Sequence, residues 1–261
     1  MHPFIERLGL AALRRLAPRA SDSFARQALY IASRPLVDRT LDRLADGRHA
    51  AVRGGPFAGL KMLKQSSGTS HVAKILGTYE AQLHGWIERV IAASPGLIVN
   101  VGCGDGYYLC GMALRLPLAQ AIGFDTDPLC RREAAETAAA NGLARVRIEA
   151  EATPAALQAA LVDGTIVIVD CEGAEGDILD PARTPRLRTC TMLIELHDHL
   201  VPNTTQMLHA RFQDSHRIEE RAQTIALPES MADRPEIERL ALVCEHRECA
   251  QGWMLLTPRA A

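Results

Sequence analysis

The sequence lacks a surplus of positive charge, because it contains 29 Lys and Arg residues and 31 Asp and Glu residues, which give a net charge of −2. Proteins that bind nucleic acid through its phosphates need a basic surface, so we expect no nucleic acid as the main partner. Long apolar runs are also missing, since no stretch approaches the roughly 18 to 20 residues that span a bilayer. We therefore expect no integral membrane segment.

Paired cysteines are missing as well, because the seven cysteines are scattered and form no CxxC motif. An odd number of scattered cysteines is typical of reduced thiols and disfavours a disulfide framework or a zinc site. This pattern predicts a cytoplasmic location. Hydrophobic residues still make up 48% of the 261 residues, which suffices for a globular core and excludes a disordered or fibrous chain.

The chain is predicted to divide into residues 1–73, with helices and a short hairpin, and a main domain over residues 74–261. Arg14 and Arg15 interrupt the apolar run near the beginning of the sequence, which indicates an amphipathic helix and not a signal peptide. The first segment is expected to cap the main domain or to pair two subunits in a homodimer that acts on a small-molecule substrate.

Local patterns refine this division. Residues 3–46 are predicted to be helical, with breaks near Pro18 and Pro35, and residues 52–63 to form the hairpin around its Gly and Pro turn. Apolar residues at helical spacing predict one continuous helix over residues 74–93.

Beyond residue 96 the pattern changes to short apolar runs bounded by turns, which alternate with helical stretches. Such runs are typical of buried strands in a parallel sheet with helices on both faces. Five strands are expected at 97–101, 121–125, 146–150, 165–170 and 191–196, and two more at 216–222 and 253–257. The sequence therefore predicts an α/β fold with a doubly wound, mostly parallel seven-stranded sheet and an N-terminal helical extension.

A glycine-rich loop follows the first of these strands and precedes a helix that begins near Tyr107. Its spacing, with Gly102, Gly104 and Gly106, is GxGxG and not the GxGxxG of dinucleotide folds. Gly102 allows a sharp turn off the strand, and the other two remove Cβ atoms so that backbone approaches a ligand. The helix N-terminus then offers free N–H groups to a carboxylate.

Two acidic residues at the ends of the next strands support a nucleoside ligand. Asp125 ends the second strand, where a carboxylate accepts hydrogen bonds from a ribose diol. Asp127 fits the cap of the following helix, which leaves Asp125 for the ligand. Glu151 follows the third strand and is placed to accept from an exocyclic amine. Together these residues predict an adenosine-type ligand whose other end resembles an amino acid.

This order of elements resembles the class I S-adenosylmethionine-dependent methyltransferases. The D-x-E-G-x-E segment over residues 170–175 and LIELHD over residues 193–198 are similar to the FkbM-type methyltransferases. The resemblance implies a Rossmann-like methyltransferase fold with S-adenosylmethionine as cofactor. It covers roughly residues 74–200, and a FkbM-like enzyme modifies hydroxyl groups of small molecules.

The resemblance also assigns cofactor contacts, residue by residue. Asn100 departs from the family, which has an acid before the glycine loop, and Glu80 from the preceding helix is expected to compensate. Tyr79 and Glu80 are expected to close over the cofactor. The other implied contacts are Gly102, Cys103, Gly104 and Gly106 for the methionyl part, Asp125 and Thr126 for the ribose, Glu151 and Ala152 for the adenine, and Asp170.

Three side chains at the ends of the fourth and fifth strands are candidates for catalysis. His197 is the expected general base, because an unperturbed imidazole titrates near pH 6.5. Asp170 and Glu172 are expected to orient the acceptor or the imidazolium. A divalent cation shared by these three residues is the alternative, which the sequence favours less, so no metal is assigned.

The leading functional hypothesis is an enzyme that methylates a hydroxyl group of a sugar or a secondary metabolite. One alternative is intramolecular displacement on the aminobutyrate chain of the cofactor, which releases methylthioadenosine. Another is a catalytically silent module that only binds the cofactor. The presence of the whole loop and of Asp170 disfavours the silent module.

Overall fold

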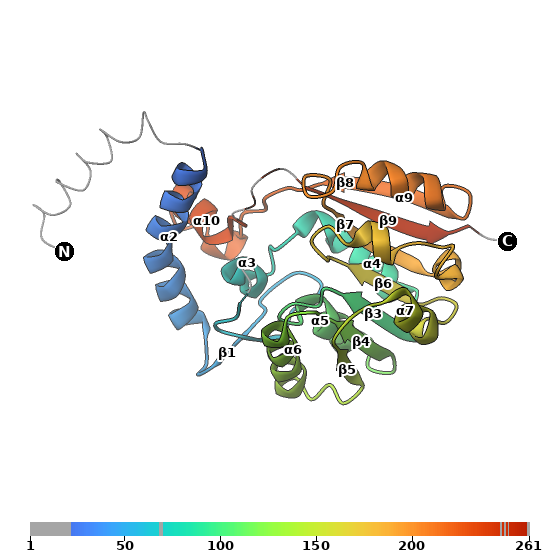
Figure 1. Cartoon of the computed structure of the whole chain (residues 1–261). Helices are drawn as coiled ribbons and strands as arrows, with labels where there is room; N and C mark the ends of the chain where they lie inside the picture. Colours follow the sequence, from blue (N-terminus) through green and yellow to red (C-terminus); the bar gives the residue numbers. More distant parts are fainter. Residues whose placement is uncertain (1–21, 68–69, 246, 248, 250, 260–261) are drawn as a thin grey trace, which may run out of the picture.

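The computed structural model describes residues 22–67, 70–245, 247, 249 and 251–259. A seven-stranded sheet in the order β5-β4-β3-β6-β7-β9-β8 forms its centre (Figure 1). β9 runs antiparallel to both of its neighbours, and the remaining strand pairs are parallel. This arrangement confirms the predicted doubly wound, mostly parallel sheet. The strands are β3 (Leu97–Val101), β4 (Gln120–Phe124), β5 (Val146–Glu149), β6 (Ile166–Val169), β7 (Thr191–Leu196), β8 (His216–Ala222) and β9 (Gly252–Pro258).

The central strands β3 and β6 are buried along their whole length because helices cover both faces of the sheet. Ile98 of β3 packs into the core on one face, and its neighbour Val99 packs into the core on the other. The first face is covered by α4 (His84–Ala92), α5 (Tyr107–Arg115) and α6 (Pro128–Ala140). The second face is covered by α7 (Pro154–Ala160), α9 (Thr204–Phe212) and the 3-10 helix η3 (Pro185–Thr189).

The prediction of a helix break near Pro35 was wrong, because α2 (Asp22–Leu44) continues through this residue. A proline in a helix interior costs roughly 3 kcal/mol. Packing of α2 against α3 (His71–Leu76) and α10 (Glu236–Val243) offsets this cost, and the three helices lie together beside the sheet (Figure 1). The predicted break near Pro18 and the features at Arg14 and Arg15 lie outside the described residues.

The continuous helix predicted over residues 74–93 was also wrong. The chain leaves α3 at Gly77, and a short 3-10 helix, η2 (Ala81–Leu83), separates it from α4. Glu80, at the start of η2, adopts a left-handed backbone conformation with φ of 46°. Apolar side chains on both sides of this break are buried in one core, so they match the helical spacing without a continuous helix.

The predicted hairpin is present, with its first strand slightly earlier than expected. It pairs β1 (His49–Ala51) with β2 (Lys61–Leu63). The side-chain amide of Asn141, at the end of α6, bonds both the N–H and the carbonyl of Lys61 and fixes the hairpin to the main domain. In the described part of the chain, no helix is both long and apolar enough to cross a membrane. The remaining elements are α8 (Glu175–Ile178) and η4 (Glu229–Met231).

Candidate functional site

A cavity of about 1320 Å³ opens at the carboxyl ends of the central parallel strands, where the loops after β3, β4, β5 and β6 meet. Open parallel sheets bind ligands at this edge, because neighbouring loops diverge there and leave a crevice. The structure brings many of the predicted site residues together around this cavity: Tyr79, Gly102, Gly104, Asp125, Thr126, Glu151, Ala152, Asp170 and Glu172.

Gly102 and Gly104 serve different purposes in the glycine loop. Gly102 has φ of 73°, and a Cβ atom there would lie 1.6 Å from the carbonyl oxygen of Asp170. Gly102 therefore allows the glycine loop to pack directly on the end of β6. Gly104 has φ of 51°, and a Cβ atom there would meet no atom within 4 Å. Because Gly104 also lines the cavity, its bare backbone faces the space that a ligand would fill.

Three of the predicted cofactor residues lie behind the cavity wall. Asn100 is buried, and its amide Nδ2 donates to the carbonyl oxygen of Ile168 at 3.3 Å. Cys103 is also buried, and burial raises the pKa of its thiol well above the usual range. Gly106 packs against α6, since a Cβ atom there would lie 3.2 Å from the Cα of Ala134. The expectation that Gly106 exposes backbone to a ligand is therefore corrected.

Asp125 holds the glycine loop and the loop after β4 together. One carboxylate oxygen accepts from the N–H of Gly104 at 2.8 Å, and the other accepts from the N–H of Asp127 at 2.9 Å. Asp127 in turn caps α6 by accepting from the N–H of Leu129, as predicted. A carboxylate offers about four lone-pair sites, so Asp125 retains acceptor capacity toward the cavity.

Lys74 and Asp105 form a buried ion pair that the sequence reasoning missed. The ammonium of Lys74 donates to both carboxylate oxygens of Asp105, at 2.9 and 3.0 Å, and both residues line the cavity. Burial alone would raise the pKa of Asp105, but Lys74 and His71 outweigh it, so this pKa lies below its usual value. Lys74 also lies over the ring of Tyr79, at 5.2 Å from its centroid. The pair thus ties α3 to the glycine loop.

Replacing Lys74 with methionine is expected to lower the free energy of unfolding by about 3 to 5 kcal/mol, because Asp105 would remain buried without its partner. The double variant Lys74→Met/Asp105→Asn removes the stranded charge and is expected to regain part of this loss. Urea unfolding measures both values. Equal stability of the single and the double variant would contradict the assignment of a stabilising buried pair.

Glu80 does not take the place that the sequence suggested. Its carboxylate is fully buried and accepts from the hydroxyl of Tyr108 and from the guanidinium of Arg247. Arg247 also donates to Glu195 and to its near neighbour Glu245, so one cation holds three carboxylates, two of them from distant parts of the chain. Burial raises the pKa of Glu80 to about 7. Glu80 therefore anchors the segment that carries Arg247 and does not close over the cavity from a helix.

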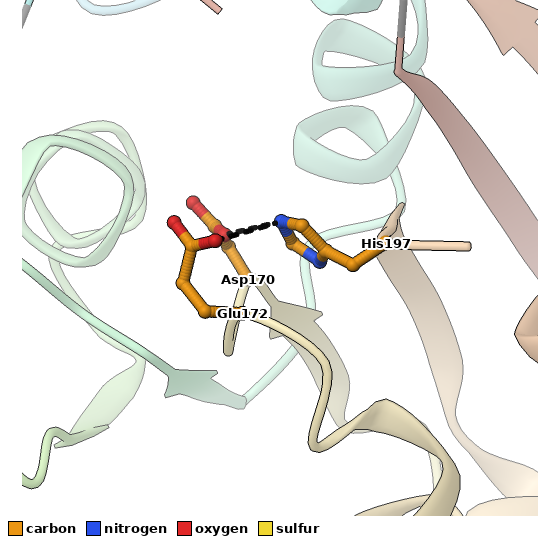
Figure 2. A group of neighbouring side chains, drawn as sticks. All are labelled: Asp170, Glu172 and His197. Atoms are coloured by element: carbon orange, nitrogen blue, oxygen red, sulfur yellow. Dashed lines mark ion pairs between the residues drawn. The ribbon is translucent and has the colours of Figure 1, made fainter. Parts of the chain in front are cut away.

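The three predicted catalytic side chains lie together, and Asp170 and Glu172 line the cavity whereas His197 does not. Figure 2 shows Asp170 and Glu172, from the loop after β6, facing the ring of His197 at the end of β7. Nε2 of His197 lies 3.7 Å from Asp170 Oδ1 and 3.5 Å from Glu172 Oε2. The side chain of His197 is only 1% exposed, whereas that of Glu172 is 76% exposed. The three side chains therefore extend from the buried interior at His197 to the solvent at Glu172.

Glu175, which the sequence analysis assigned no role in the site, orients His197 from behind. Its Oε1 lies 2.6 Å from Nδ1 of the imidazole, and both side chains are buried. Burial lowers the pKa of His197, but this hydrogen bond and the charges of Glu175 and Asp170 outweigh burial and raise it above its usual value. Burial raises the pKa of Asp170, and the charge of Glu172 adds to this shift.

Similarity to known proteins is found among solved structures. No family model and no curated protein matches the chain in sequence. Among solved structures, a putative O-methyltransferase from Klebsiella pneumoniae matches with 14% identity and a TM-score of 0.48, over 87% of this chain and 90% of that one. A SAM-dependent methyltransferase from Thiobacillus denitrificans, in complex with S-adenosyl-L-homocysteine, matches with 14% identity and a TM-score of 0.41, over 68% and 91%. An rRNA methylase from Streptococcus thermophilus matches with 10% identity and a TM-score of 0.43, over 68% and 96%. These similarities concern the arrangement of the backbone alone.

Proposed function

We propose that this protein is an S-adenosylmethionine-dependent methyltransferase that acts on a hydroxyl group of a small molecule, such as a sugar or a secondary metabolite. The observation that carries the proposal is the junction of Gly104 and Asp125. A bare loop backbone and a carboxylate with spare lone pairs meet there at one cavity. This is the combination that a nucleoside with an amino-acid end requires.

The cavity offers a place for each part of the cofactor. Asp125 with Thr126 would hold the ribose hydroxyls, and Glu151 with the backbone of Ala152 would face the adenine. The methionyl part would lie along the glycine loop, where the ammonium of Lys74 attracts its carboxylate. A typical small-molecule pocket measures roughly 300 to 1000 Å³. The observed 1320 Å³ therefore leaves room for a second molecule, the acceptor.

The charge of the cavity supports a small acceptor over a nucleic acid. The carboxylates of Asp170 and Glu172, which line the cavity, would repel a phosphate backbone. The resemblance of residues 170–175 to FkbM-type enzymes supports oxygen as the acceptor atom. Seven free thiols support the further proposal that the enzyme works in the cytoplasm.

Methyl transfer is a direct displacement, and the proposed roles follow from it. A lone pair of the acceptor oxygen attacks the methyl carbon, and the carbon–sulfur bond breaks. The electron pair would return to sulfur, which would give S-adenosylhomocysteine, and the hydroxyl proton would pass to the group formed by Asp170, Glu172 and His197. An alcohol is a poor nucleophile until its proton departs, so the acceptor must be aligned and activated. Asp170, Glu172 and His197 would do this at the cavity end opposite the adenine.

The test combines calorimetry with an untargeted search for the acceptor. S-Adenosylmethionine and S-adenosylhomocysteine are expected to bind in the micromolar range, about −8 kcal/mol. The protein is then incubated with methyl-labelled cofactor and extracts of its own cells, both small-molecule and RNA fractions. Label in a small molecule together with S-adenosylhomocysteine supports the proposal. Label in RNA, release of methylthioadenosine, or absence of binding to folded protein contradicts it.

Replacing Asp125 with alanine is expected to weaken cofactor binding by about 1.5 to 3 kcal/mol, through loss of charge-assisted hydrogen bonds to the ribose. Calorimetry measures the change. Asp127→Ala, which removes only the cap of α6, serves as the control for loss of local structure. Equal losses of affinity in both variants would show that Asp125 acts through the loop and not through the ligand.

A further inference from the structure

The orientation of the His197 ring is the first observation that favours a metal ligand over a role in proton transfer alone. Glu175 lies behind the ring, with its Oε1 2.6 Å from Nδ1, so the other ring nitrogen, Nε2, points toward Asp170 and Glu172. Metal-ligating imidazoles are commonly held in this way, by a carboxylate that fixes the tautomer and makes the ligand more basic. Nε2 forms no hydrogen bond within the described residues, although the side chain is 99% buried.

The charge balance around this ring is the second observation. The carboxylates of Asp170, Glu172 and Glu175 all lie within 3.7 Å of one imidazole. Arg247, which lines the same cavity, is already bonded to Glu80, Glu195 and Glu245. Even a protonated imidazole supplies one positive charge against three negative ones. The group therefore has a deficit of positive charge that a divalent cation would remove.

The third observation is the spacing of the donor atoms. One atom each of Asp170, Glu172 and His197 lies within 4.8 Å of the other two (Figure 2). Two ligands at 2.1 Å from one ion are about 3.0 to 3.4 Å apart at octahedral or tetrahedral angles. The distances of 3.5 and 3.7 Å from Nε2 approach these values. A small rotation of the exposed Glu172 side chain would complete the set.

We propose that Asp170, Glu172 and His197 bind one divalent cation of the Mn²⁺ or Mg²⁺ class, which in turn binds the acceptor oxygen. Two carboxylates with one imidazole suit such ions, and the open side of the group faces the cavity, where further ligands enter. The part that concerns the acceptor rests on the proposed methyltransferase function. The cation would lower the pKa of the bound hydroxyl, whose proton then leaves to water beside Glu172 as the oxygen attacks the methyl carbon.

Binding of Mn²⁺ to the full chain, freed of metals with a chelator, tests the site without any turnover. Electron paramagnetic resonance measures the free ion. One Mn²⁺ per chain is expected to bind. Glu172→Gln, which changes an exposed side chain and leaves the core intact, is expected to weaken binding at least tenfold, as are Asp170→Asn and His197→Ala. Glu175→Gln, which changes only the orienting residue, is expected to weaken it about 10- to 100-fold.

A surface pair of the same chemistry provides the control. His209 and Glu220 lie 2.5 Å apart on α9 and β8, without a third donor close by among the described residues. Glu220→Gln is therefore expected to leave Mn²⁺ affinity unchanged. Equal Mn²⁺ affinity of the wild type and Glu172→Gln would overturn the site. If Mn²⁺ binds as expected but S-adenosylmethionine does not, the metal site holds and the proposed function fails. Undiminished methyl transfer in the presence of a chelator would overturn the catalytic role of the ion.

Discussion

Gly104→Val is expected to abolish binding of S-adenosylmethionine while leaving the protein folded. The added side chain would extend into the open cavity, where no protein atom lies within 4 Å of its Cβ position. It would fill the space that the proposed function assigns to the methionyl part. The left-handed backbone at this residue adds a strain of about 1 to 2 kcal/mol, which is small against the stability of a domain. Calorimetry and thermal unfolding measure the two effects separately.

Gly102→Ala is the matched contrast within the same loop. Its methyl group would overlap the carbonyl oxygen of Asp170, a backbone atom that cannot move aside without displacing the end of β6. We expect this variant to lose stability strongly or to fail to fold. Wild-type cofactor affinity in Gly104→Val would refute the placement of the cofactor along the loop.

His197→Ala is expected to lower turnover by about 10² to 10⁴ while the dissociation constant of S-adenosylmethionine stays nearly unchanged. The reason is the position of the ring, which lies beside Asp170 and Glu172 at the end of β7, whereas Asp125 and Glu151 follow β4 and β5 on the other side of β3. Single-turnover kinetics with labelled cofactor, together with calorimetry, separates the two quantities.

His209→Ala serves as the control for the loss of an imidazole, because this residue lies on the outer surface, paired with Glu220. Its turnover is expected to match that of the wild type. Full turnover in both His197→Ala and Glu172→Ala would show that neither side chain is needed to activate the acceptor. The enzyme would then act by aligning the acceptor alone. Loss of cofactor affinity in His197→Ala would instead place the ring beside the cofactor.

Much of the fold could be predicted because the strands carry a local signal. β3 and β6 are buried on both faces, so each appears in the sequence as a short run between turns that is apolar except for Asn100 of β3. Residues 74–93, which lead into β3, were wrongly predicted as one continuous helix for a related reason. The spacing of apolar residues indicates which side chains are buried, but it does not indicate whether the backbone between them stays helical. The turn at Gly77 and the left-handed Glu80 left that spacing intact.

Most of the site that could be predicted consists of residues that closely follow a strand. Gly104, Asp125 and Asp170 meet at the cavity because parallel strands end at one edge of the sheet. Lys74 and Asp105 are 31 residues apart, and Arg247 is 167 residues from Glu80, so no local pattern links the partners. Glu175 belongs to the D-x-E-G-x-E segment, but the sequence assigned it no role in the site, and its contact with His197 is known only from the structure.

The position of β9 has a consequence for the order in which the chain is synthesised. β9 lies between β7 and β8, so β8 joins the sheet only through a strand that leaves the ribosome after it. Until residues 252–258 emerge, β7 presents an unpaired edge with the apolar side chains Met192 and Ile194. Such edges promote association between incomplete chains. Nascent chains that stall at residue 251 are therefore expected to depend on chaperones, even though all residues that line the cavity have by then been made.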